Sequence, residues 1–411
     1  MNDKYSYPIN EVREQFPALN RKFNEKSITY LDGPGGTQVV KGTIKAMVNY
    51  MENGGANLHG SFPTSVETEE RIKEAKNSVA DMLGAKANEI AFGANMTSLA
   101  LSIARAIGKE IKTGDEIVVT EIDHRANVDP WISMAEDKGA TVRWIKVNPK
   151  TLTLELDNLD KVINENTKLV AVGLASNAVG TINDVELISR RAKEAGALVA
   201  VDAVHAAPHI AIDRDRLGAD ILLCSAYKFF GPHVGIAAIK EEVFERLNPF
   251  KLKPAPSYIP DKLETGTQNH EGIAGIKPAI EFIEKLGSGS TRRERITSGM
   301  RRIEDYENGL AEKLRQGLRE LDEVTLYEAA DNVLKTPTIA FTINGFLSKE
   351  VCKRLAAEHG IFIADGHFYT TSLAEKLNVN EVGGWVRAGL APYNTESEVD
   401  DFLTAIKAIL K

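Results

Sequence analysis

Residues 197–203 read ALVAVDA and residues 221–235 read ILLCSAYKFFGPHVG, and this part of the chain decides the fold. An apolar run, 197–201, leads into Asp202, and a second run, 221–224, leads into Ser225 and Lys228. One acid and one lysine are therefore expected at the ends of two core strands. Because open α/β sheets bind ligands at the carboxyl ends of their strands, this stretch is a candidate site.

Lys228 stands directly after an expected buried strand and before Phe-Phe-Gly-Pro, which is an unusual place for a solvated charge. A partly desolvated lysine has a lowered pKa and can form a Schiff base. Pyridoxal phosphate (PLP) needs such a lysine and an acid that faces its ring nitrogen, and Asp202 fits the second role. Taken singly, the two residues are more commonly a surface lysine and a turn-opening acid. The pair, with Ser225 in the same compact segment, favours a site.

Length and composition limit the number of domains and the classes of function to be expected. At 411 residues the chain exceeds one ordinary core, so two domains are expected. The net charge of -8 gives no support for a nucleic-acid partner. No apolar stretch is long enough to span a membrane, and the N-terminus lacks an apolar signal core. Cys224 and Cys352 make neither a disulfide framework nor a zinc site, and a cytoplasmic location is the simplest expectation. The eight histidines have no ligand spacing such as His-Glu-x-x-His, so no metal is expected.

Strand-like and helix-like stretches alternate through the first two thirds of the chain. Strands are expected near residues 89, 116, 142, 168, 197, 221 and 234. Apolar spacing predicts a helix from Ser65 to Gly84. The alternation is typical of a mostly parallel sheet in an α/β fold. A linker-like stretch, 287–291, then precedes a charged helix and strands at 337–343 and 361–364, which predict a smaller α/β domain.

Other candidate side chains also follow expected strands. The turn 93–98 opens a helix, so its backbone N–H groups and the helix dipole favour a phosphate. That signal is weak alone, because many helices begin with a Thr or Ser cap. His124 and Asn177 follow the next expected strands, and each is by itself a common loop residue.

Together these motifs resemble the class V aminotransferase family of fold type I PLP-dependent enzymes, which includes cysteine desulfurases, selenocysteine lyases and kynureninase. The resemblance covers roughly residues 28–408. Segment 202–232 is similar to Asp-x-x-(Gln/His) followed by Ser-x-x-Lys-x-x-Gly-Pro, and 121–131 to Glu-x-(Glu/Asp)-His-x-Ala-Asn-x-x-Pro-Trp. Segments 264–269 and 387–395 are similar to the family's Gly-Thr loop and Arg…Tyr-Asn-Thr motif.

The resemblance implies a fold and a domain plan. We expect a large domain with a mostly parallel seven-stranded sheet, together with a smaller α/β domain. An N-terminal segment, 1–30, should pack with the small domain. The large PLP-binding domain should span 31–286, and the C-terminal small domain 287–411.

The resemblance also implies four catalytic residues. Lys228 would form the Schiff base and move the substrate's α-proton, and Asp202 would hold the protonated pyridine nitrogen. His124 would stack on the pyridine ring and assist proton transfer. His205 stands where desulfurases commonly have glutamine, and it would bond the ring oxygen or move protons near neutral pH.

Further residues are implied to bind the cofactor and the substrate. Arg387 would clamp the substrate's α-carboxylate with its planar fork, which implies an amino-acid substrate. The plain alternative for Arg387 is a salt bridge at a strand edge. Asn177 would contact both the cofactor and the substrate, and Met96 would contribute only its backbone N–H. The implied cofactor-binding set is Met96, Thr97, His124, Asn177, Asp202, His205, Ser225, Lys228 and Thr267.

The resemblance implies a homodimer, in which the Gly266-Thr267 loop crosses the interface and completes the partner's site. One family feature is missing. Desulfurases carry a cysteine on a mobile loop that forms a persulfide, but the corresponding loop, 365–371, reads DGHFYTT. The chain is therefore most similar to a cysteine desulfurase-like branch, and a persulfide is not expected. Substrate selectivity is expected in loops 33–37 and 367–371.

We therefore expect a PLP-dependent enzyme acting on an amino acid. Loss of a β-substituent from the carbanion would make a lyase, reprotonation at the cofactor a transaminase, and reprotonation on the other face an epimerase. A C–S lyase needs only the carbanion and a leaving thiol, and we place it narrowly first, before the transaminase and then the epimerase. The alternative from a different functional class is a non-catalytic protein with this fold, such as a sensor or a scaffold.

Overall fold

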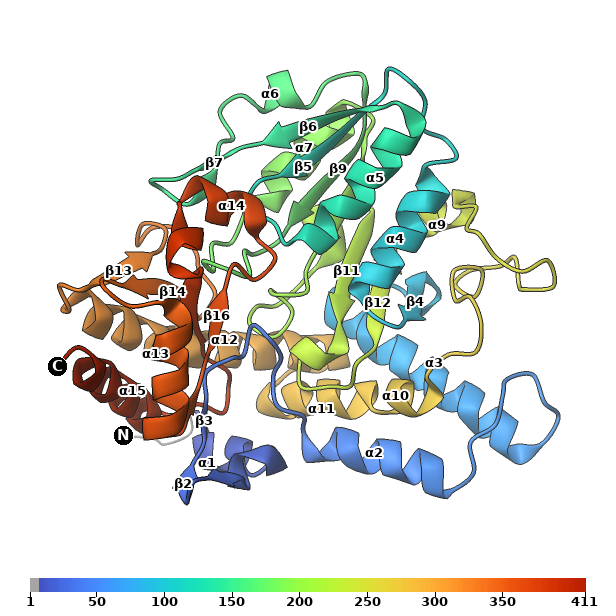
Figure 1. Cartoon of the computed structure of the whole chain (residues 1–411). Helices are drawn as coiled ribbons and strands as arrows, with labels where there is room; N and C mark the ends of the chain where they lie inside the picture. The colour runs from blue at the N-terminus through green and yellow to red at the C-terminus, as the bar shows by residue number, and fades with distance from the viewer. Residues whose placement is uncertain (1–6) are drawn as a thin grey trace.

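The computed structural model describes residues 7–411, so residues 1–6 of the expected N-terminal segment lie outside the described residues. A large sheet forms the centre of one part of the molecule, and a second sheet lies in a smaller part beside it (Figure 1). Within residues 7–411, no helix is both long and apolar enough to cross a membrane.

The large sheet has seven strands in the order β4-β12-β11-β10-β9-β5-β6. All neighbours run parallel except β12, which is antiparallel to both β11 and β4. The predicted seven-stranded, mostly parallel sheet is therefore confirmed. Its strands are β4 (Ile90–Gly93), β5 (Glu116–Thr120), β6 (Thr141–Ile145), β9 (Thr167–Gly173), β10 (Leu198–Asp202), β11 (Ile221–Ser225) and β12 (Gly235–Ile239).

Helices cover both faces of this sheet, which is why its central strands are apolar throughout rather than alternating. Successive residues of β9 pack into opposite cores, Val170 and Val172 on one face and Leu169 and Ala171 on the other. The first core is closed by α3 (Pro63–Leu83), α7 (Val185–Glu194) and α11 (Ile276–Leu286). The second is closed by α4 (Met96–Ile107) and α5 (Asp129–Lys138).

The smaller part contains a four-stranded antiparallel sheet in the order β13-β14-β17-β16. The expected strand 361–364 is divided between β15, which pairs with β3 near the N-terminus, and β16, which joins the small sheet. The elements are β3 (Thr29–Tyr30), β13 (Val324–Tyr327), β14 (Thr338–Ile343), β15 (Ile361–Phe362), β16 (Ala364–Gly366), β17 (Trp385–Gly389), α12 (Arg292–Arg319), α13 (Ser348–Arg354) and α15 (Glu396–Ile409).

The described N-terminal residues touch both parts. Arg13, at the end of α1 (Ile9–Arg13), donates to Glu398 on α15 at 2.9 Å. Phe16 packs edge-on against Phe230 of the large part and against Tyr393. The domain boundaries at residues 31 and 287 stay a prediction.

The remaining elements are short connections and outer layers. They are α2 (Lys41–Glu52), α6 (Leu159–Val162), α8 (Arg214–Leu217), α9 (Glu241–Arg246), α10 (His270–Ala274), α14 (Thr371–Lys376), β1 (Lys22–Phe23), β2 (Lys26–Ser27), β7 (Val147–Asn148), β8 (Thr153–Leu154), η2 (Pro17–Asn20), η3 (Ala87–Glu89), η4 (Arg125–Asn127), η5 (Ala226–Lys228), the π-helical turn η6 (Leu355–His359) and η7 (Val379–Val382).

Strands β5, β9, β10 and β11 are parallel, so their carboxyl ends meet at one edge of the sheet. Loops from the smaller part lie against this edge (Figure 1). The fold thus brings the strand-end side chains of the large part opposite the small part.

Candidate active site

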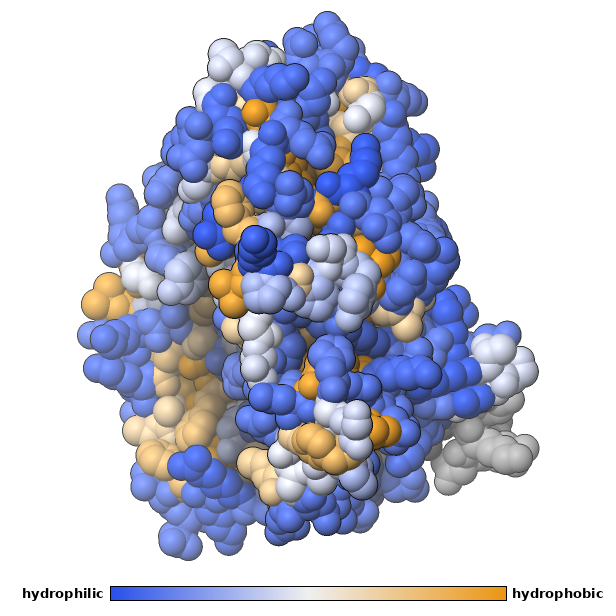
Figure 2. All heavy atoms as spheres, turned by 90° about the vertical axis from the view of Figure 1, so that its right-hand side faces the viewer, coloured by the Kyte–Doolittle hydropathy of each residue, from blue (hydrophilic) through white to orange (hydrophobic). Residues whose placement is uncertain are grey.

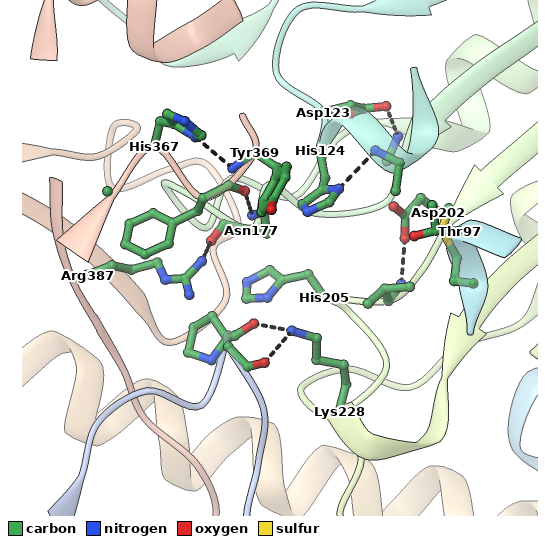
Figure 3. A pocket seen from close by; sticks show the side chains of 18 of the residues that line it. Thr97, Asp123, His124, Asn177, Asp202, His205, Lys228, His367, Tyr369 and Arg387 are labelled. Carbon is green, nitrogen blue, oxygen red and sulfur yellow. Dashed lines mark hydrogen bonds between the residues drawn. The ribbon is translucent and has the colours of Figure 1, made fainter. Parts of the chain in front are cut away.

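A cavity of about 680 Å³ lies at this sheet edge, a size typical of small-molecule sites. Thr267 is exposed and is not among the residues that line it. The other predicted site residues do line it: Met96, Thr97, His124, Asn177, Asp202, His205, Ser225, Lys228 and Arg387. All of these except Met96 and Ser225 are labelled in Figure 3.

Lys228 is one turn beyond the end of β11 and is 9% exposed. Its Nζ donates to the backbone carbonyls of Pro34 and Gly35, the second at 3.1 Å. Burial lowers the pKa of this amine to about 8, with the positive charge of Arg387 acting in the same direction. The amine is thus much closer to its neutral, nucleophilic form than an ordinary lysine is.

Asp202 ends β10, and its Oδ1 accepts a hydrogen bond from the Val204 N–H at 2.8 Å. Burial raises the pKa of this carboxyl to about 6, against the opposing effects of that N–H and of Lys228. It stays largely ionised at pH 7 and can hold a cationic group across the cavity.

A second buried carboxyl, Asp123, lines the same cavity and was not among the predicted site residues. It accepts from the Gly173 N–H at 2.7 Å and from Asn127 Nδ2 at 2.9 Å. Burial raises its pKa to about 7, and the nearby Asp202 adds to the rise. Its place three residues after the end of β5 was the available sequence signal.

His124 follows β5 and begins the short turn η4. Its Nδ1 accepts the Ala126 N–H at 3.0 Å. Burial lowers the pKa of His124 to about 4, and Lys228 and Arg387 lower it further, so its ring is neutral at pH 7. The ring lies 5.2 Å from that of Tyr369, at an interplanar angle of 31° (Figure 3).

His205 is 4% exposed, and its ring points into the cavity (Figure 3). Its Nε2 lies 3.0 Å from the hydroxyl oxygens of both Thr336 and Thr338. Its Nδ1 is buried and has no hydrogen-bond partner. Burial lowers the pKa of His205 well below its usual value, which favours an uncharged ring near neutral pH.

The N-terminus of α4 has fewer backbone N–H groups free to bind a phosphate than the sequence suggested. Asn95 caps this helix by accepting the Ser98 N–H at 2.9 Å. The Met96 N–H, expected to be available to a phosphate, donates instead to Ser225 Oγ at 3.1 Å. Since Ser225 accepts there, its own hydroxyl proton remains available to an anion, beside Thr97 in the first turn of α4.

Arg387 on β17 is 3% exposed. Its Nη1 donates to the Asn177 carbonyl at 2.8 Å, and its Nη2 lies 3.4 Å from Asp32 Oδ1. The ring of Phe368 lies 3.6 Å from its Cζ, and its Nε is buried without a hydrogen-bond partner. Burial lowers the pKa of Arg387 to about 10, so the guanidinium stays charged at pH 7.

Loop 366–370 forms the wall of the cavity that the smaller part contributes. Phe368 and Tyr369 have left-handed backbones, with φ of 51° and 59°. Asn177 fastens the loop, because its Nδ2 donates to the Phe368 carbonyl at 2.8 Å and its Oδ1 accepts from Thr370 Oγ1 at 2.9 Å. The stacking of Phe368 on Arg387 has no counterpart among the sequence predictions.

Neither cysteine of the chain lies in loop 366–370, although Cys352 interacts with Asp365, the residue directly before it. Cys224 is within β11 and is fully buried, and Cys352 on α13 is 7% exposed. Burial raises the pKa of both thiols, so both are protonated at neutral pH. Among the residues that the structure describes, no group of three or more His, Cys, Asp or Glu side chains could hold a metal ion.

Known proteins resemble this chain over nearly its whole length. The family model described as aminotransferase class-V matches residues 29–402. An aminotransferase-like protein, FGM3, of Gibberella zeae is 31% identical, covering 98% of this chain and 99% of its own. A cysteine desulfurase of Enterobacter sp. is 31% identical, covering 98% of each chain.

Two solved structures also resemble this chain over nearly its whole length. A cysteine desulfurase from Thermococcus onnurineus, solved as the apo protein, has a TM-score of 0.88 and 29% identity, covering 98% of each chain. The cysteine desulfurase CsdA from Escherichia coli has a TM-score of 0.86 and 26% identity, covering 98% of this chain and 99% of its own.

Proposed function

Because the chain belongs to the aminotransferase class V family, whose members are PLP-dependent enzymes, we propose that it is a C–S lyase acting on an amino acid. The observation that carries the proposal is one cavity that contains Lys228, Asp202 and Arg387 but no cysteine on its loop wall. The same proposal places the enzyme in the cytoplasm as a homodimer.

The residues of the cavity fit PLP. Lys228 is a buried amine with a lowered pKa, and Asp202 is a buried carboxylate suited to a pyridinium. Ser225 and Thr97 are suited to the phosphate at the start of α4. The unpartnered Nδ1 of His205 is a vacant hydrogen-bonding position suited to the ring oxygen.

PLP, when bound, supplies the electron sink that stabilises a carbanion at the substrate's Cα. Lys228 Nζ would hold the cofactor and would be the base that takes the proton from the substrate's Cα. Asp202 would hold its negative charge toward a pyridinium nitrogen, and His124 would contribute a neutral ring beside the cofactor. Arg387 orients the substrate by its α-carboxylate, through the Nε and Nη2 edge beside Asp32.

Elimination then needs no cysteine nucleophile. The electron pair left at Cα by removal of the proton would form a Cα=Cβ bond as the Cβ–S bond breaks, and the thiolate would leave with the bonding electrons. Water would then hydrolyse the released enamine to a keto acid and ammonia. Cys224 and Cys352 are both buried, and burial raises the pKa of both thiols, so neither is suited to carry a persulfide. Transamination is the first alternative and epimerisation the second, since both begin with the same loss of the α-proton.

The dimer proposal rests on the face that contains Thr267. Large apolar side chains are exposed on α2, at the residue before α3 and in the loop between α9 and α10, among them Met51, Phe62, Phe250 and Leu252. Both α2 and α3 pack against α10, the helix that follows Thr267. Figure 2 shows apolar surface gathered in places on this otherwise hydrophilic side. Covering it with a second subunit would bury the apolar area and bring the Gly266-Thr267 loop to the partner's phosphate site.

Hybrid dimers test that arrangement. A dimer of one Lys228→Ala subunit and one Thr267→Ala subunit should contain one fully intact site if Thr267 acts in the partner. A purified hybrid dimer should therefore have about half the activity of the wild-type dimer, and a random equal mixture of the two variants about a quarter. If Thr267 acts within its own subunit, every site carries a defect and mixing restores nothing.

Product analysis tests the reaction itself. The purified protein with PLP is given cysteine, cystine and other amino acids one at a time, and pyruvate, ammonia, sulfide and thiols are measured. Pyruvate with ammonia and a released sulfur product supports the lyase. A keto acid without ammonia would make the enzyme a transaminase, and racemised amino acid an epimerase.

A further inference from the structure

Glu121 is the first residue of the motif at 121–131, and the function described so far gives it no role. It directly follows β5 and is not among the residues that line the cavity. Its Oε2 accepts the Val147 N–H of β7 at 2.9 Å. Lys376, the last residue of α14, donates to the same Oε2 and, at 3.2 Å, to the Val147 carbonyl. We call these three residues the α14 anchor, because they join the end of α14 to β5 and β7 (Figure 1).

The short segment after β5 contacts both the cavity and the loop wall, through different residues. Asp123 and His124 line the cavity. Glu121 bonds α14, and the Arg125 N–H donates to the Tyr369 carbonyl at 2.9 Å. One segment of the large part therefore carries cavity groups together with two attachment points of the facing wall.

The turn between β16 and α14 has an unfavourable backbone, because Phe368 and Tyr369 are both left-handed. Such a conformation at a residue other than glycine persists only where the surrounding structure holds it. On one side β16 is paired in the small sheet. On the other side α14 buries Leu373 and Ala374, both 0% exposed, in the same core as strand β9 of the large part. Both ends of the turn must stay in place for Phe368 to remain stacked on Arg387.

We propose that Glu121 and Lys376 are positioning residues, which fix α14 to the large part and thereby hold the turn that keeps Phe368 on Arg387. The kinetic consequence rests on the proposed function, in which Arg387 binds the substrate's α-carboxylate. Neither Glu121 nor Lys376 is among the residues that line the cavity, so neither contacts substrate or cofactor. Their effect should therefore appear in the binding of the amino acid and not in the removal of its α-proton.

Partial burial distinguishes this contact from an ordinary surface ion pair. The side chains of Lys376 and Glu121 are 30% and 19% exposed. The Val147 backbone gives each charge a second partner, since its N–H donates to the carboxylate and its carbonyl accepts from the ammonium. Hydrogen bonds to charged groups contribute more than neutral ones, and solvent weakens them less when the pair is partly buried. Loss of the lysine would leave the partly buried carboxylate without its cation.

Hydrogen exchange, measured by mass spectrometry on the full chain without cofactor or substrate, tests the anchor directly. In Lys376→Met the backbone amides of residues 366–377 should exchange about two- to tenfold faster than in the wild type. Lys376→Arg keeps the charge and several donors, so it should restore the wild-type rate. The matched control is Lys313→Met, because Lys313 is 33% exposed and pairs with Glu396 and Asp400 on α15 instead. The control should leave the exchange of 366–377 unchanged.

Steady-state kinetics of the PLP-loaded enzyme separates positioning from general damage. In Lys376→Met, KM for the amino acid should rise about two- to tenfold, while kcat stays within about twofold of the wild type. PLP absorbance should not change, because the strand-end groups are untouched. Lys313→Met also removes one charge, and it should change neither KM nor kcat.

A double variant tests whether the two residues act through one contact. Glu121→Gln keeps an oxygen acceptor for the Val147 N–H and removes the charge, so KM and exchange should change in the same direction as in Lys376→Met. Effects that pass through a shared contact are not additive. The double variant should therefore be no more affected than the more affected single variant. Effects that multiply in the double variant would overturn the inference.

Either unchanged exchange or unchanged KM in a folded Lys376→Met variant would overturn the inference, and so would equal changes in Lys313→Met. If Lys376→Met does not fold, Glu121→Gln decides in the same way, since it keeps the hydrogen-bond acceptor. A wild type that binds no PLP or turns over no amino acid would overturn the proposed function instead, and it would leave the exchange result as it is.

Discussion

The two walls of the cavity are built in different ways. Lys228, Asp202 and His124 follow the ends of buried parallel strands, so the regular sheet fixes their positions. The facing wall, loop 366–370, has left-handed backbones at Phe368 and Tyr369 and is held by side-chain hydrogen bonds to Asn177. The strand-end wall therefore contains the groups for the shared chemistry, and the loop wall is suited to set which substrate fits.

Replacing a group of the strand-end wall should have the largest effect. Asp202→Asn removes the carboxylate that we propose keeps the ring nitrogen protonated, and kcat should fall by about 10² to 10⁴. Steady-state kinetics with saturating PLP measures this fall. Asp123→Asn is the matched control, a buried carboxyl at the same edge, and its activity should fall less than about tenfold. Equal losses in both variants would contradict the assignment to Asp202.

Arg387 lies between the two walls and should govern binding more than turnover. Arg387→Lys keeps the charge but loses the planar fork, so KM for the amino acid should rise roughly 10- to 100-fold, the effect of a charged hydrogen bond. Arg354→Lys, which changes a surface pair with Glu358, is the control and should leave KM unchanged. An unchanged KM in Arg387→Lys would count against the carboxylate clamp.

The lowered pKa of Lys228 predicts how PLP capture depends on pH. Only the neutral amine attacks the aldehyde, and its fraction rises about tenfold per pH unit below the pKa. With a pKa of about 8, the capture rate should rise from pH 6 to 8 and level off near pH 9. Stopped-flow absorbance measures this rate. A rise that continues beyond pH 10 would indicate an ordinary, solvated lysine.

The smallest effect is expected at the loop wall. Phe368→Ala removes the ring stacked on Arg387, a contact worth about 0.5 to 2 kcal/mol, so KM should change by roughly 2- to 30-fold. Relative activity on different amino acids should change as well, while PLP absorbance should stay as in the wild type. Phe368→Tyr keeps the stacked ring and should retain the wild-type preference. Loss of PLP absorbance in Phe368→Ala would contradict the assignment of cofactor binding to the strand-end wall and substrate preference to the loop wall.

The sequence predicted the strand-end wall because its signals are local. Apolar runs located the strands, and Asp202 and Lys228 directly follow them. The fold rule then placed both at one edge, which the structure confirms for the sheet. Asp123 had the same signal and was overlooked as a separate group.

The loop wall could not be predicted in this way, for physical reasons. Non-glycine residues with left-handed backbones, such as Phe368 and Tyr369, carry no reliable sequence signature. The contacts of Thr336 with His205 depend on how two distant segments pack. The Met96 N–H was expected at the phosphate, but only the structure places Ser225 Oγ within its reach.

The most direct test of the account is to trap PLP on the protein with borohydride, which reduces a Schiff base to a stable bond, and to locate the label by peptide mass spectrometry. The account predicts one labelled lysine per chain, Lys228, and no label or visible absorbance band in Lys228→Ala. A label on another lysine, or a band retained in Lys228→Ala, would contradict the central claim that this buried amine is the site of the chemistry.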